Sequence, residues 1–228
     1  MGRNRDRPVV LNEVVTRTRI LLALPAMLAM ASPAQARVTE IGQTTAVAAP
    51  SCPKFPCLAI SRTTGYQAKI GPRLGLFTIP RDGRLVAWTI SLGKTGPKQT
   101  AFFDKNYGGS ARAGISVIKT GAKLFGRIVG AGPIVPLEKW FGRTVQFALP
   151  RSIVVHKGEV VALTVPTWAP ALAVGLGNDT SWRASRAPSR CRDTQSQSAQ
   201  TGRDDLTRYT CLYKTARLTY SATLVSTP

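Results

Sequence analysis

The sequence predicts an all-β domain whose antiparallel strands pack as a sandwich. Three observations support this fold class. Many short segments alternate apolar and polar residues, the 20 glycines and 16 prolines suit frequent turns, and the four cysteines suit two disulfides. With 228 residues, 43% of them hydrophobic, the chain can form one domain with an adequate core. Long connections, above all residues 178–208, favour a jelly-roll-like or Greek-key sandwich over an up-and-down barrel.

The N-terminal residues 1–36 are typical of a signal peptide. Arg17 and Arg19 precede the uncharged run Ile20–Ala31, and a small-x-small motif predicts cleavage after Ala36. The run is shorter than the roughly 20 apolar residues that a membrane-spanning helix needs. We therefore expect an exported, extracellular protein whose mature chain has no transmembrane anchor.

Cleavage after residue 36 leaves a strongly basic chain. Residues 1–36 hold five of the 31 basic and two of the 11 acidic residues, so residues 37–228 keep 26 basic and nine acidic residues, a net charge of +17. Such a surface attracts polyanions. Outside a cell, anionic envelope polymers and polysaccharides are the expected partners. The basic residues are scattered and accompany no nucleic-acid-binding motif, so no specific nucleic-acid partner is expected.

Small and polar residues dominate 37–51, which is predicted to be a flexible lead-in to a single β-sandwich domain at 52–228. Cys52–Cys57 is predicted to be a tight turn. The clearest strand after it is Arg84–Leu92, because apolar residues with a period of two indicate a half-buried strand. Its predicted core face consists of Val86, Trp88, Ile90 and Leu92.

Further strands follow the same pattern. Thr144–Leu149 alternates, and Arg217–Leu224 points Leu218 and Tyr220 inward and Arg217 outward. No window of 11 or more residues after residue 36 gives a good helical stripe, so no helix is expected. The other candidate strands are Leu58–Ser61, Gln67–Gly71, Gly75–Ile79, Gly114–Lys119, Gly126–Val129, Ser152–His156, Val160–Pro166, Ala171–Gly175 and Tyr209–Lys214.

The cysteines Cys52, Cys57, Cys191 and Cys211 allow three disulfide connectivities. Pairing of sequence neighbours is preferred, because each bond then closes a local loop, and the second would pin the long polar segment 177–208. Structureless loops longer than about 15 residues are uncommon unless they are functional or disordered. The spacings do not form C-x2-C pairs and only one histidine is present, so no metal and no cofactor are expected.

Aromatic and arginine side chains in polar segments are the candidate ligand-binding residues. A Trp ring can stack on a sugar or a cation, and an arginine can bind phosphate or carboxylate. The alternatives are core packing or loop anchoring for the tryptophans and simple solubility for the arginines. The candidates are Trp140, Trp168, Trp182, Arg183 and Arg186.

Templates for catalysis mostly fail. His156 is the only histidine, it stands beside a predicted turn, and no nucleophile can be paired with it. Three glutamates and six aspartates in residues 37–228 leave a carboxylate pair possible. We therefore expect a non-catalytic, surface-associated binding domain. A carboxylate-dependent extracellular hydrolase and a structural or adhesion module that binds a protein are the alternatives.

Two segments, Val155–Val165 and Leu218–Leu224, resemble core strands of secreted bacterial jelly-roll-like β-sandwich domains. The resemblance covers 18 residues, contains no catalytic residue and implies the fold class alone. Some domains of this appearance bind carbohydrate.

Overall fold

The computed structural model describes residues 1–2, 36–45 and 48–226. The chain separates into two compact units, Met1–Pro33 and Ala34–Pro228, and the fold described below is that of the second unit. The predicted signal peptide lies almost entirely outside the described residues.

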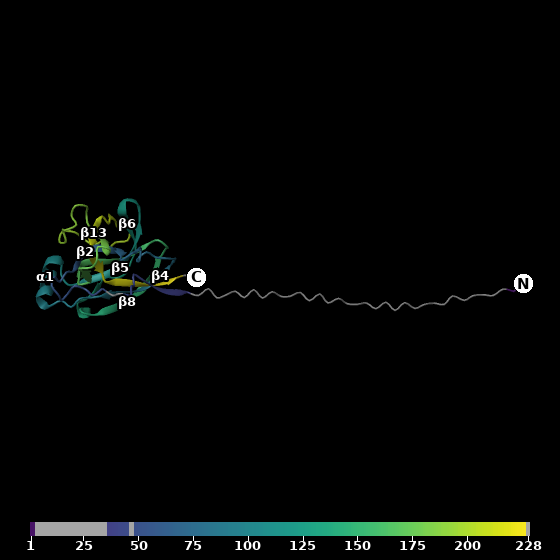
Figure 1. Cartoon of the computed structure of the whole chain (residues 1–228), viewed down its shortest axis with the longest axis horizontal. Coiled ribbons are helices and arrows are strands. Elements are labelled where there is room, and N and C mark those ends of the chain that lie inside the picture. The colour runs from purple at the N-terminus through teal and green to yellow at the C-terminus, as the bar shows by residue number, and fades with distance from the viewer. Residues whose placement is uncertain (3–35, 46–47, 227–228) are drawn as a thin grey trace. The chain divides into compact units, whose positions relative to one another are not determined.

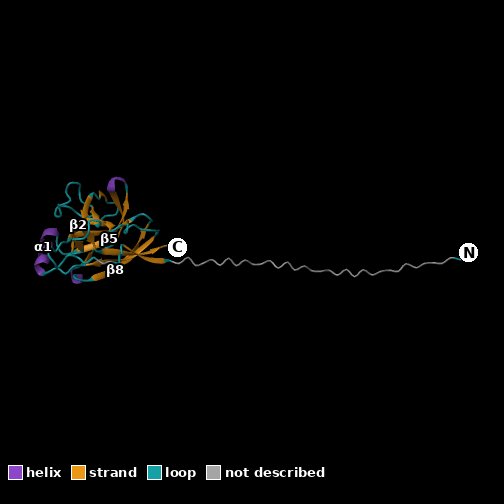
Figure 2. Ribbon diagram, in the orientation of Figure 1, coloured by secondary structure: helices purple, strands orange, loops and turns teal. Residues whose placement is uncertain are grey.

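The second unit is built from antiparallel strands, as predicted (Figures 1 and 2). The strands are β1 (Arg37–Ile41), β2 (Ile60–Ile70), β3 (Arg73–Leu74), β4 (Gly83–Ser91), β5 (Arg112–Thr120), β6 (Phe125–Ala131), β7 (Val135–Pro136), β8 (Thr144–Val155), β9 (Val160–Ala169), β10 (Leu172–Val174), β11 (Ser181–Ala184), β12 (Leu206–Arg208), β13 (Cys211–Lys214), β14 (Ala216–Leu218) and β15 (Tyr220–Ser226). The helices are α1 (Pro97–Tyr107) and two 3-10 turns, η1 (Ala122–Leu124) and η2 (Glu138–Trp140).

Two sheets enclose the main hydrophobic core. The smaller sheet has the order β1-β15-β4-β8, and the larger sheet runs β12-β6-β5-β9-β2-β11-β13 with β3 beside β2 and β7 beside β5. Strands β10 and β14 form a separate pair. Trp88 and Leu224 of the smaller sheet share a buried cluster with Ile115 and Leu163 of the larger sheet. Burial of this apolar surface between two antiparallel sheets gives the sandwich.

Strand β1 corrects the prediction that residues 37–51 are a flexible lead-in. Arg37–Ile41 pairs antiparallel with β15, and Arg37 stands opposite Ser226. Glu40 accepts hydrogen bonds from the hydroxyls of Ser221 and Thr223 on β15. The segment is polar because it is an edge strand held by backbone pairing and these hydroxyls.

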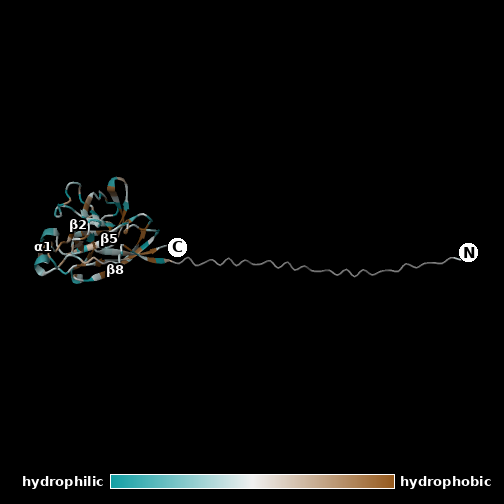
Figure 3. Cartoon of the chain, viewed as in Figure 1, coloured by the Kyte–Doolittle hydropathy of each residue, from teal (hydrophilic) through white to brown (hydrophobic). Residues whose placement is uncertain are grey.

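Helix α1 contradicts the expectation that no helix forms. It begins with Pro97 at its first turn, the Gln99 side chain accepts the Gly96 N–H at 2.8 Å, and Gly108 ends it with φ of 89°. These are good start and stop signals. Phe103 is its one buried residue, and Figure 3 shows hydrophilic residues along much of the helix, so it presents no apolar stripe for periodicity to detect.

Strand β4 has its predicted core face except at one position. Trp88, Ile90 and Leu92 are buried, but Val86 is half-buried and Leu85 takes its place in the core. The register between β4 and β8 shifts between Leu85 and Ala87, so the alternation is broken there.

Arg217, predicted to point outward, is buried instead. Its guanidinium donates to the Thr44 hydroxyl at 2.8 Å and to the Gly42 carbonyl at 3.3 Å. The segment after β1 therefore covers this face of β14, which the alternation of β14 alone cannot reveal.

Candidate functional site

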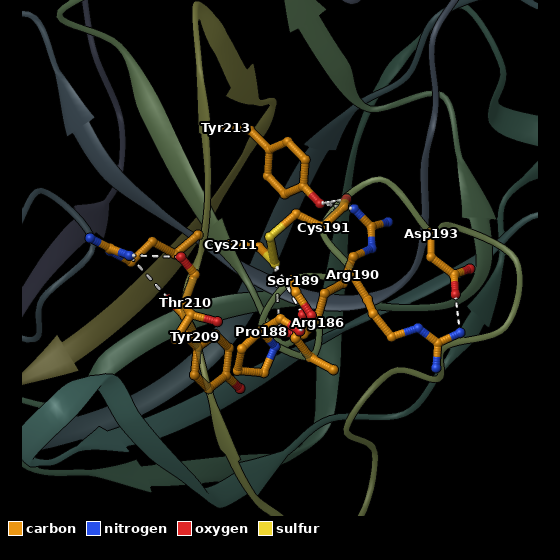
Figure 4. The surroundings of a disulfide bond; sticks show 12 residues. Arg186, Pro188, Ser189, Arg190, Cys191, Asp193, Tyr209, Thr210, Cys211 and Tyr213 are labelled. Carbon is orange, nitrogen blue, oxygen red and sulfur yellow. Dashed lines mark hydrogen bonds and ion pairs between the residues drawn. A yellow bond between two sulfur atoms is a disulfide. The ribbon is translucent and has the colours of Figure 1, made fainter.

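The long polar segment forms a held loop, but a shorter one than predicted. Strands β11 and β12 occupy its two ends, which leaves residues 185–205 as the connection. The Cys191–Cys211 disulfide pins it to β13 (Figure 4). Cys52–Cys57 closes the early turn, so both predicted bonds are present. The Arg62 Nε–H also donates to the Gln197 carbonyl at 2.7 Å.

Three of the predicted ligand-binding residues instead contact the long loop or the segments beside it. Trp182 is only 3% exposed and stacks on Tyr213, with ring centroids 4.4 Å apart. Buried Arg186 donates to the Ser61 carbonyl at 2.7 Å and to the Tyr213 hydroxyl (Figure 4). Arg183 donates to the Tyr209 carbonyl at 3.2 Å. The expectation of ligand contact is wrong for Trp182 and Arg186, because a neighbouring strand and the loop cover them.

The other two tryptophans lie at the α1 end of the sandwich. Trp168 is fully buried, and its indole N–H is shared between the Asp104 carboxylate at 2.8 Å and the Gly109 carbonyl at 3.1 Å. It therefore anchors α1 and cannot stack on a ligand. Trp140 is half-buried against Phe147, with the Lys139 ammonium 4.9 Å from its ring centre.

A cleft of about 640 Å³ opens where β8 of the smaller sheet meets β5 and β6 of the larger sheet. Its size falls within the usual range for ligand sites, about 300 to 1,000 Å³. The charged and titratable residues that line it are Lys119, Arg151, His156, Glu159 and Arg203.

The path of β8 explains why Arg151 faces this cleft. Opposite the single residue Val86, β8 carries the four residues Leu149–Ser152, so it bulges away from β4. Pro150 suits the bulge because it has no N–H to offer to a neighbouring strand. The Arg84 Nε–H donates to the Ser152 hydroxyl at 2.7 Å and ties the bulge to β4.

Gly130 allows the two sheets to meet closely at the cleft. A Cβ atom at Gly130 of β6 would stand 2.5 Å from Cγ2 of Ile153 of β8, a distance that side chains do not tolerate. The absence of a side chain therefore lets β6 and β8 approach and form the cleft floor.

Two turns, at residues 81–82 and 157–158, meet at the mouth of the cleft. The Asp82 carboxylate accepts the Lys157 N–H at 2.8 Å and lies 3.3 Å from His156 Nδ1. These contacts lower the pKa of Asp82, with the Lys157 N–H as the largest cause. Glu159 is 8% exposed and accepts the His156 N–H at 2.8 Å. Both carboxylates hold backbone in place, which leaves little support for a catalytic carboxylate pair here.

The cleft carries an excess of cations. None of the ion pairs found among residues 36–45 and 48–226 includes Lys119, Arg151 or Arg203, and all three side chains are exposed. A smaller pocket of about 320 Å³ shares Lys119, His156 and Glu159 with the cleft and adds Lys157. The two hollows together form a cationic groove with one acidic side chain that is already bonded.

Lys119, Arg151 and Arg203 were not foreseen from the sequence. They come from β5, β8 and the long loop, and Lys119 and Arg203 are more than 80 residues apart in sequence. Nothing in the local sequence distinguishes any of them from the other basic residues, of which the chain has 31 in all. Only the packing of β6 against β8, across the two sheets, brings them together.

The described part of the chain holds no group of three or more His, Cys, Asp or Glu side chains arranged for a metal ion. Within the same residues, no helix is long and apolar enough to span a bilayer. No protein-family model, curated protein or solved structure matches this chain. Two disulfides in one domain are typical of proteins that mature outside the cytosol.

Proposed function

We propose that this protein is an exported, non-catalytic binding domain that holds an anionic envelope polymer or acidic polysaccharide in the groove between β8 and β5–β6. The observation that supports the proposal best is the group of three exposed cations, Lys119, Arg151 and Arg203, around one cleft with no ion pair among the described residues. Like-charged side chains in a shared cleft attract a chain of anionic groups. The signal peptide predicted at residues 1–36 would supply the export.

Arginine suits this role because its planar guanidinium donates two parallel hydrogen bonds to a carboxylate or phosphate. Arg151 sits on a bulge that is tied down by Arg84, so its backbone is held in place. The Lys119 side chain at the other wall adds a mobile charge. A polymer that lies along the groove would reach Lys157 through the adjoining pocket.

The experiment compares two doubly substituted proteins of equal charge. Arg151→Gln with Arg203→Gln removes two cations of the groove, and Arg73→Gln with Lys214→Gln removes two exposed cations on β3 and β13. Fluorescence anisotropy with labelled polygalacturonate and polyphosphate at 0.15 M salt measures the affinity. We expect the groove variant to bind at least about tenfold more weakly, since each charge-assisted hydrogen bond contributes about 1.5 to 3 kcal/mol.

The control variant should lose no more than about threefold. Equal losses in both variants would show that the net charge alone attracts the polymer, and the groove proposal would be wrong. A difference between the two polymers would identify carboxylate or phosphate as the preferred anion.

A further inference from the structure

The disulfide loop and the start of α1 form an exposed apolar patch, which we call the Phe55 patch. It consists of Phe55, Pro56, Leu58 and Phe102. Phe55 is 99% exposed, Phe102 57% and Leu58 43%. These side chains border a depression of about 460 Å³ whose wall includes Lys98. Rings exposed to this degree on a folded domain mark an interaction surface.

The loop that carries Phe55 is held firmly at its base. Cys52 is buried and bonded to Cys57, and the Ser51 hydroxyl both accepts the Leu58 N–H at 3.0 Å and donates to the Leu58 carbonyl at 3.1 Å. The Ser51 N–H donates to the Leu172 carbonyl at 2.9 Å. Phe55 therefore projects from a closed loop and does not fold back onto the core.

Phe102 is supported from behind by other aromatic rings. Its ring centre lies 5.6 Å from that of buried Phe103, which lies 4.8 Å from that of Trp168. The Trp168 indole in turn holds Asp104 of the same helix. The exposed ring is thus fixed to the core through α1.

Exposed lysines flank these rings. Lys54 precedes Phe55, Lys98 lines the depression, and Lys94 precedes α1. Asp104 is the one acidic residue in residues 48–58 and 93–107, and its carboxylate accepts the Trp168 indole N–H. The patch is therefore apolar at its tip and cationic at its edge.

We propose that the Phe55 patch docks on an anionic lipid bilayer, with Phe55 and Phe102 among the headgroups and upper acyl chains and the lysines against anionic headgroups. Protruding aromatic rings with neighbouring lysines are suited to the bilayer interface. A protein partner fits less well: stable interfaces bury about 1,000 Å² or more and their centres are depleted of lysine. Here Lys54 stands directly beside the most exposed ring.

The test is sedimentation of the purified protein with vesicles of phosphatidylglycerol and phosphatidylcholine, and with vesicles of phosphatidylcholine alone. We expect binding to the anionic vesicles, a loss of about tenfold or more in Phe55→Ser with Phe102→Ser, and a loss of about fivefold for each of Lys54→Gln and Lys98→Gln. The Arg73→Gln with Lys214→Gln protein is the control for charge and should bind almost normally.

A second measurement does not depend on removal of the rings. In Phe55→Trp, the new indole should be quenched by brominated lipid in anionic vesicles and not in phosphatidylcholine vesicles, when compared with the wild-type protein. Unchanged binding of the Phe55→Ser with Phe102→Ser protein, or no added quenching, would overturn the proposal. A concentration-dependent dimer that disappears in the serine variant would assign the patch to a second copy of the chain and also overturn it.

The two proposals can fail separately. Arg151→Gln with Arg203→Gln leaves the Phe55 patch intact and should bind anionic vesicles as the wild type does. Loss of vesicle binding in this groove variant would contradict the bilayer proposal. The polymer proposal depends on the anisotropy measurement and would stand or fall separately.

Discussion

Among single residues, two buried tyrosine hydroxyls have opposite surroundings. Tyr209 is fully buried and its hydroxyl makes no hydrogen bond within the described chain, whereas the Tyr220 hydroxyl donates to the Val161 carbonyl at 2.9 Å. A buried unpaired hydroxyl costs about 1 kcal/mol or more, and a satisfied one contributes about 1 kcal/mol. Urea unfolding at pH 7 should therefore show Tyr209→Phe more stable than the wild type by about 1 kcal/mol and Tyr220→Phe less stable by a similar amount.

Burial of these tyrosines also predicts an effect at alkaline pH. Burial raises the pKa of Tyr209 and of Tyr220 above the ordinary value of 10. A tyrosine whose pKa is raised in the folded state contributes its full stability below about pH 10, the pKa of the unfolded chain. This contribution is lost as the pH rises toward the folded-state pKa, because the unfolded chain ionises first. Tyr209→Phe should therefore lose less stability than the wild type between pH 9 and pH 11. An equal loss would show that Tyr209 does not ionise on unfolding.

Single-residue environments were the hardest feature to predict. The sequence supports Trp88 as a core residue, and the structure confirms it, because Trp88 is fully buried in the cluster between the two sheets. Trp182 and Arg217 look like surface residues in a polar context, yet a stacked tyrosine covers the first and the segment after β1 covers the second. Their burial depends on elements distant in sequence, which local alternation does not specify.

At the level of elements, the two disulfides should stabilise the domain unequally. Their sequence separations are 20 residues for Cys191–Cys211 and five for Cys52–Cys57. On the loop-entropy relation, the longer loop contributes about 3 kcal/mol and the shorter about 2 kcal/mol. We expect Cys191→Ser with Cys211→Ser to be the less stable of the two double variants in urea unfolding.

The matched double variant Cys52→Ser with Cys57→Ser serves as the comparison. In the Cys191→Ser with Cys211→Ser variant, the hydrogen bonds of Arg62 to Gln197 and of Gln200 to Thr64 would still hold the long loop. A larger loss of unfolding free energy in the Cys52→Ser with Cys57→Ser variant would mean that the Cys52–Cys57 disulfide stabilises the domain through native packing at the α1 end and not through loop entropy.

Elements could be predicted wherever an apolar face alternates over several residues. Strand β4 follows its predicted segment for this reason, and β5 and β9 follow theirs as apolar runs buried on both faces. The predicted strand Arg217–Leu224 is instead divided between β14 and β15. The paired cysteines were predicted from their proximity in sequence. Helix α1 was missed because one buried phenylalanine does not make a periodic face. The bulge in β8 was missed because strand register is a property of two strands, so the position of Arg151 could not be inferred.

The whole molecule places the groove and the Phe55 patch at opposite ends. In β4, Gly83 pairs with Val155 beside the groove and Ser91 pairs with Thr144 beside the α1 end. The nine residues of β4 span about 30 Å at about 3.3 Å per residue. Figure 1 agrees, since α1 lies at the end of the domain away from the last, yellow part of β15, where Ser226 pairs with Gly83.

This separation predicts that one molecule can hold a polymer and a bilayer together. With anionic vesicles and labelled polygalacturonate present, the wild-type protein should carry the polymer into the vesicle pellet, because a patch-bound molecule directs its groove away from the lipid. The Phe55→Ser with Phe102→Ser protein should leave polymer and protein together in the supernatant, and Arg151→Gln with Arg203→Gln should pellet without polymer. If polymer instead releases the wild-type protein from vesicles, the two anions compete for one diffuse positive surface, and the two-ended arrangement is wrong.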